Sequence, residues 1–89
     1  MKKIKNCTVE GIEIVSGVRR SDNQPFRYRR LHCLYPLPYG NQYEGQGSLS
    51  CSISDDEFRE DGIELGSTIT VISAIENGIT RYSYGYAEN

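Results

Sequence analysis

Apolar and polar residues alternate along most of this chain, and a period of two residues predicts half-buried β-strands. The clearest example is the run in which Leu49, Cys51 and Ile53 alternate with serines. In the first strand the alternation changes phase at Gly11, which predicts a β-bulge that bends the strand. The pattern predicts five strands in all, over residues 5–18, 26–35, 48–54, 68–75 and 79–86.

The segments between these strands contain residues that favour turns. Residues 20–25 form a polar turn rich in Ser, Asp, Asn and Pro, so the first hairpin should project its tip into solvent. Asn77-Gly78 is the strongest short signal for a two-residue hairpin. Residues 36–47 contain two prolines, three glycines and two tyrosines, and this composition predicts a loop.

A short helix is predicted between the third and fourth strands. Ser54 and Glu57 have the spacing of a capping box, and Gly62 provides a stop. We expect one or two turns, with Phe58 facing the core. The order β-β-β-α-β-β in a single domain, residues 1–89, predicts an all-β, five-stranded OB-type barrel. An SH3-like barrel is the structural alternative, but it does not require a helix at this position.

Composition favours a cytoplasmic protein without a membrane segment. No run approaches the roughly 20 apolar residues that a membrane-spanning helix needs. Polar residues follow the basic start of the chain, where a secretory signal would be apolar. The cysteines Cys7, Cys33 and Cys51 are odd in number and widely spaced, so we expect buried thiols in a reducing compartment and not a disulfide framework.

The sequence offers little that supports catalysis or metal binding. His32 is the only histidine, and the adjacent Cys33 should point to the opposite face of the same strand, so the two do not form a catalytic pair. The cysteines lack the close paired spacing of a zinc site. No glycine-rich phosphate loop precedes a helix. We expect a protein that is not an enzyme and that uses no metal or cofactor.

Arginines and aromatic residues are interleaved around the first predicted hairpin. Guanidinium groups pair with phosphates, and aromatic rings offer surfaces on which unpaired bases stack at about 1–3 kcal/mol each. Charges on an edge hairpin also prevent aggregation, but exposed aromatic residues do not fit that explanation well. The net charge is −2, so the basic character is local. The candidate nucleic-acid-binding residues are Arg19, Arg20, Phe26, Arg27, Tyr28, Arg29 and Arg30, together with Tyr43 from the glycine-rich connection.

A second aromatic feature is the set Tyr82, Tyr84 and Tyr86 in the last predicted strand. Regular alternation would place all three on one face. A half-buried sheet face or a dimer interface explains such a stripe slightly better than a stacking platform does.

The first hairpin resembles one in the single-stranded-DNA-binding, helix-destabilising proteins of filamentous bacteriophages. The shared order is the run Ser16-Gly17-Val18-Arg19-Arg20, then Pro25-Phe26 and, further along, Cys33. Looser similarity extends over most of the rest of the chain.

This resemblance implies an OB-fold homodimer that coats single-stranded DNA cooperatively, without sequence preference and without a cofactor. It implies a phosphate contact at Arg20, a binding groove along Phe26 and Tyr28, and a stacking role for Tyr43. Residues 77–79 would correspond to the hairpin that shapes the dimer.

The chain departs from that family at Ser50 and Ser52, where the family has a basic residue, and in its acidic C-terminal end. Two hypotheses therefore stand. The first is a sequence-nonspecific single-stranded DNA-binding protein of a phage or mobile element, with RNA left open as a ligand. The second is a small β-barrel module that binds a protein partner, such as a host factor, and binds no nucleic acid.

Overall fold

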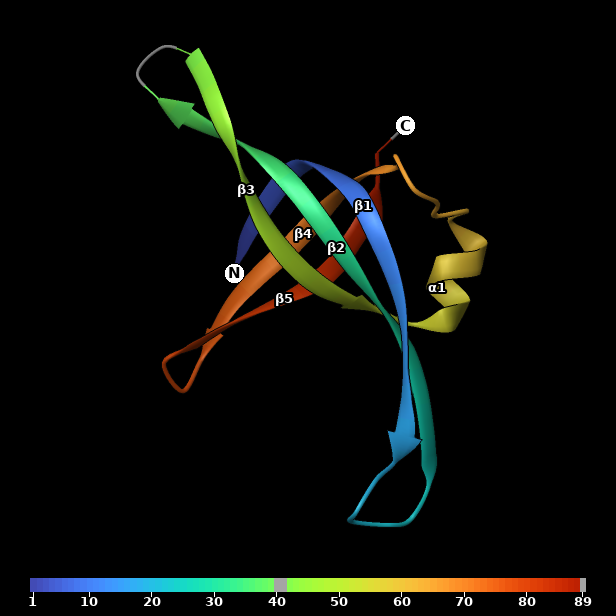
Figure 1. The fold of residues 1–89 in the computed structure, drawn as a ribbon. Coiled ribbons are helices and arrows are strands. Elements are labelled where there is room, and N and C mark those ends of the chain that lie inside the picture. The colour runs from blue at the N-terminus through green and yellow to red at the C-terminus, as the bar shows by residue number, and fades with distance from the viewer. Residues whose placement is uncertain (40–41, 89) are drawn as a thin grey trace.

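Five β-strands close into a barrel, and one short helix lies beside it (Figure 1). The computed structural model describes residues 1–39 and 42–88, and it describes side chains outside residues 38–44. The elements are β1 (Lys2–Val18), β2 (Pro25–Tyr39), β3 (Gln42–Ile53), α1 (Asp55–Glu60), β4 (Thr68–Glu76) and β5 (Ile79–Ala87). The strand order around the barrel is β1-β2-β3-β5-β4, with β3 and β5 parallel and the other neighbours antiparallel. This order, with the helix between β3 and β4, confirms the predicted OB-type barrel.

β1 contributes to both halves of the barrel because it bends. Its first part pairs with β4 and its second part with β2. The register with β2 shifts between Val9 and Gly11, which confirms the predicted bulge. A further shift, in the register with β4, lies between Ile4 and Cys7. β1 begins at Lys2 and not at residue 5 as predicted, because β4 offers this first stretch a partner that is distant in sequence.

Inward-facing side chains of all five strands, together with Ile63 from the segment after α1, form one core. Its buried apolar members are Cys7, Val9, Leu31, Cys33, Leu49, Cys51, Ile53, Ile63, Ile69, Val71 and Tyr84. The three cysteines are free, buried thiols, as predicted. Burial raises the pKa of Cys7 to about 11, so this side chain stays neutral and packs as a small apolar group. The core therefore determines which side of each strand faces outward.

Within the segment predicted as a loop, residues 36–39 and 42–47 instead continue the strands β2 and β3. β2 and β3 remain paired as far as Tyr39 and Gln42, and the hairpin that they form projects from the barrel (Figure 1). The register shifts between Pro36 and Pro38, where a bulge accommodates prolines that cannot donate ladder hydrogen bonds. Pairing across the hairpin thus overrides the turn-like composition of the segment.

Helix α1 begins and ends where the capping signals predict. The Ser54 hydroxyl accepts a hydrogen bond from the Glu57 backbone N–H at 3.2 Å and donates one to the Glu57 carboxylate at 3.0 Å. Gly62, with a φ of 60°, follows the C-cap. Phe58 packs against the core, as expected. Within the described part of the chain, no helix is both long and apolar enough to cross a membrane.

The tyrosines of β5 do not form the single stripe that regular alternation predicts. The register between β4 and β5 shifts at Gly85, so Tyr84 is opposite Val71 whereas Tyr86 is opposite Thr70. Tyr84 is therefore a core residue, and Tyr86 lies on the outer side of the strand. A one-residue bulge is sufficient for this change because adjacent strand residues face opposite sides.

Candidate nucleic-acid interface

Strand β2 separates the predicted binding residues into two groups. Leu31 and Cys33 point into the core, so residues that differ from them by an odd number point outward. Phe26, Tyr28 and Arg30 therefore share the outer face of β2. Arg27 and Arg29 share the opposite face, on the side of α1.

Two aromatic rings lie side by side on the outer face. Phe26 and Tyr28 stack with ring centroids 6.2 Å apart and an interplanar angle of 21°. Gly17 of β1 lies opposite Phe26, and a Cβ atom at this glycine would approach the Phe26 ring to 3.0 Å. The missing side chain leaves room for the ring to lie across β1. The face thus presents a partly exposed aromatic surface of the kind on which bases stack.

Polar groups continue the outer face toward the barrel. Arg30 donates a hydrogen bond to the Tyr28 hydroxyl at 3.3 Å and pairs with Glu13 at 3.5 Å. His32 lies next along the strand, with Nε2 at 3.1 Å from Glu13 and Nδ1 at 2.9 Å from the Ser50 hydroxyl. Sequence analysis weighed His32 only as a catalytic partner of Cys33 and did not include it among the binding residues. Its place beside Arg30 depends on the strand alternation that also makes Phe26 and Tyr28 neighbours.

Arg27 and Arg29 connect the first hairpin to the helix. Both pair with Asp55, the first residue of α1, at 3.3 Å and 3.1 Å respectively. The Arg29 guanidinium also lies 4.2 Å from the centre of the Phe58 ring, within the range of a cation–π interaction. These two arginines therefore position α1, and the structure does not bring them together with the aromatic face.

Arg19 and Arg20 lie at the exposed tip of the first hairpin, which extends away from the barrel (Figure 1). The turn is closed by two backbone hydrogen bonds of 2.9 Å, from Arg19 N–H to the Gln24 carbonyl and from Asn23 N–H to the Arg19 carbonyl. Asn23 adopts a φ of 54°, a conformation that asparagine tolerates. The predicted stacking residue Tyr43 has its side chain outside the described residues.

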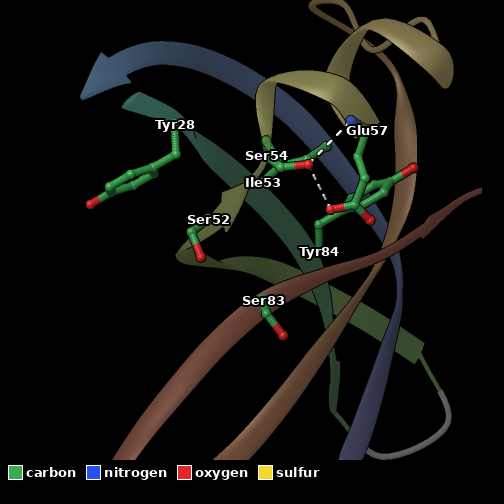
Figure 2. Close-up of a pocket in the computed structure, with 7 residues that line it drawn as sticks. All are labelled: Tyr28, Ser52, Ile53, Ser54, Glu57, Ser83 and Tyr84. Atoms are coloured by element: carbon green, nitrogen blue, oxygen red, sulfur yellow. Dashed lines mark hydrogen bonds between the residues drawn. The ribbon is translucent and has the colours of Figure 1, made fainter. Parts of the chain in front are cut away.

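A pocket of about 420 Å³ opens where the outer face meets α1 (Figure 2). Residues from β2, β3, β5 and the start of α1 line it: Tyr28, Ser52, Ile53, Ser54, Glu57, Ser83 and Tyr84. Ser52 and Ser83 meet here because they form the parallel pairing of β3 with β5. Burial, together with a hydrogen bond to Asp61, raises the pKa of the Tyr84 hydroxyl. Sequence analysis did not identify this pocket, because its walls are distant in sequence.

Among the described residues, no three histidine, cysteine, aspartate or glutamate side chains gather in a way that would hold a metal ion. No protein-family model, curated protein or solved structure matches this chain. The geometry of the outer face is therefore the basis on which a function is assigned.

Proposed function

We propose that this protein binds single-stranded DNA without strong sequence preference and serves a phage or mobile element. The observation that carries the proposal is the outer face of β2, where the stacked rings of Phe26 and Tyr28 continue into Arg30 and His32. This combination provides both surfaces for unpaired bases and a charge for the phosphate backbone. The barrel itself supports the proposal, since OB folds commonly bind oligonucleotides on this part of their surface.

The exposed arginines at the hairpin tip extend the positive charge beyond the barrel. Arg19 and Arg20 lie on the hairpin that bears the aromatic face, so a strand crossing Phe26 can reach them. Glu13 pairs with Arg30 and His32 and reduces the charge next to the barrel. We therefore expect moderate affinity that depends strongly on salt.

The test is a fluorescence-anisotropy titration of labelled oligo(dT) at two salt concentrations, with tyrosine quenching as a second signal. The logarithm of affinity should fall with the logarithm of salt, by about 0.7 for each phosphate neutralised. Phe26→Ala should weaken binding at least about fivefold through lost stacking, and Arg20→Glu should reduce the salt dependence. Arg81→Glu on β5 is the control, because it changes the net charge by the same amount as Arg20→Glu at a residue outside the proposed interface. Absence of binding at low salt, or affinity unchanged in Phe26→Ala and Arg20→Glu, would contradict the proposal.

Apolar residues exposed at the hairpin between β4 and β5 support a homodimer. Ile75 is 77% exposed and Ile79 is 59% exposed, although both belong to paired strands. We propose that a second copy of this chain covers them, because a domain of this size gains stability by burying further apolar surface. Sedimentation of the protein and of its Ile79→Lys variant should show a dimer and a monomer, respectively.

The same exposed isoleucines are what favours the alternative of a protein-interaction module. A monomer that binds no oligonucleotide but retains one specific host protein after nuclease treatment would support that alternative.

A further inference from the structure

The pocket beside α1 is continuous with the aromatic face because both include Tyr28. Figure 2 shows the Tyr28 ring on one side of the pocket and Glu57 and Tyr84 on the other, with Ser52 and Ser83 between them. A base that leaves the stack on Phe26 and Tyr28 would meet this pocket next. Its volume of about 420 Å³ lies within the range of small-molecule sites and accommodates a single nucleobase.

The side chains that line the pocket favour a ligand that donates hydrogen bonds over a ligand that carries negative charge. Glu57 contributes a carboxylate, and Ser52 and Ser83 contribute hydroxyls that both donate and accept. The carboxylate would repel a phosphate group but would accept a hydrogen bond from an amino group. The apolar edges of Ile53 and Tyr84 complete a site suited to a flat, neutral ring with an amino substituent.

We propose that this pocket holds one base of bound single-stranded DNA and favours a base with an exocyclic amino group, such as cytosine. The proposal rests on the proposed DNA-binding function. Glu57 accepts from the amino group, as acidic side chains do from cytosine N4, and a serine hydroxyl donates to the adjacent ring nitrogen. On uracil the one ring N–H lies between two carbonyl oxygens, and these repel the carboxylate.

The experiment compares the affinities of oligo(dC) and oligo(dU), because every binding register of a homopolymer places the same base in the pocket. The protein should bind oligo(dC) about tenfold more tightly, which is within the range of one specific base contact. Glu57→Gln should remove this preference, since the neutral amide also donates to the uracil carbonyl. Glutamine retains the capping interaction with Ser54, so the helix should remain intact.

Asp56→Asn is the matched control, because it removes one negative charge from the same helix at an exposed position outside the pocket. It should strengthen binding of both oligonucleotides equally and leave their ratio unchanged. Equal affinity of the unmodified protein for oligo(dC) and oligo(dU), or a preference that survives Glu57→Gln, would overturn the pocket assignment. Failure to bind either oligonucleotide would instead overturn the proposed DNA-binding function.

Discussion

Removing the charge of Arg29 should affect stability, whereas removing the charge of its neighbour Arg30 should affect DNA binding, because the two side chains lie on different faces of β2. We consider Arg29→Met and Arg30→Met, which remove the guanidinium group and keep an unbranched side chain. Arg29 should support folding and Arg30 should support DNA binding. The pair therefore tests the division of the outer face from the helix-facing side.

The cost of Arg29→Met follows from two contacts. Arg29 pairs with Asp55 at 3.1 Å, and both side chains are largely buried, at 18% and 22% exposure. A hydrogen bond to a charged group is worth about 1.5–3 kcal/mol, and a cation–π contact such as that with Phe58 adds about 0.5–1 kcal/mol. Asp55 retains Arg27, and the methionine sulfur recovers part of the aromatic contact, so we expect a loss of about 2 kcal/mol. For a domain of this size the melting temperature should fall by about 10 °C.

Arg30→Met should change stability much less. Its partner Glu13 lies 3.5 Å away, and both side chains are nearly half exposed. Exposed pairs of this kind contribute about 0.2–1 kcal/mol. The variant should instead lose one phosphate contact, which reduces the salt slope by about 0.7 and weakens binding about fivefold at 0.1 M salt.

Both variants should be measured by thermal unfolding and by oligo(dT) titration at several salt concentrations below the melting temperature. We expect a lower melting temperature with an unchanged salt slope for Arg29→Met, and a nearly unchanged melting temperature with a smaller salt slope for Arg30→Met. An Arg29→Met variant that keeps its melting temperature but loses salt dependence would refute the assignment of faces.

Three further predictions concern the barrel. Gly85→Ala should destabilise the protein by about 2 kcal/mol or more in urea unfolding, because the alanine Cβ would lie 2.7 Å from the Thr70 carbonyl oxygen. A variant as stable as the wild type would show that the bulge relaxes to accept the methyl group. Leu31→Ala should cost about 2–5 kcal/mol in the same assay through a cavity in the core, and a loss below 1 kcal/mol would contradict its central position. Raising the pH should lower the urea midpoint, because folding raises the pKa of Cys7 from 9.0 to about 11 and that of Tyr84 above 10.0. The neutral forms are favoured in the folded state, so this stabilisation is complete below pH 9.0 and is lost as the pH rises; a constant midpoint up to pH 11 would contradict it.

The sequence by itself determined the order of elements along the chain, the helix and the fold class that this order indicates, because the signals for the individual elements are local. Alternation of Leu49, Cys51 and Ile53 marks β3 whatever its neighbours are, and the capping interaction at Ser54 needs only the residues that follow it. The turn at Asn77-Gly78 is similarly local, since both residues adopt positive φ, as a tight hairpin of this type requires.

The tertiary structure decided which of these residues meet. Arg29 and Asp55 are 26 positions apart in the sequence, and only the packing of α1 beside β2 brings them into contact. The pocket likewise depends on the pairing of Ser52 with Ser83. The physical reason is that a strand reverses its facing side at every residue, so a single bulge or register shift reassigns the side chains beyond it. The bulge at Gly11 is visible in the local alternation of β1, whereas the shifts between Ile4 and Cys7 and at Gly85 arise in the pairing with β4 and were not predicted.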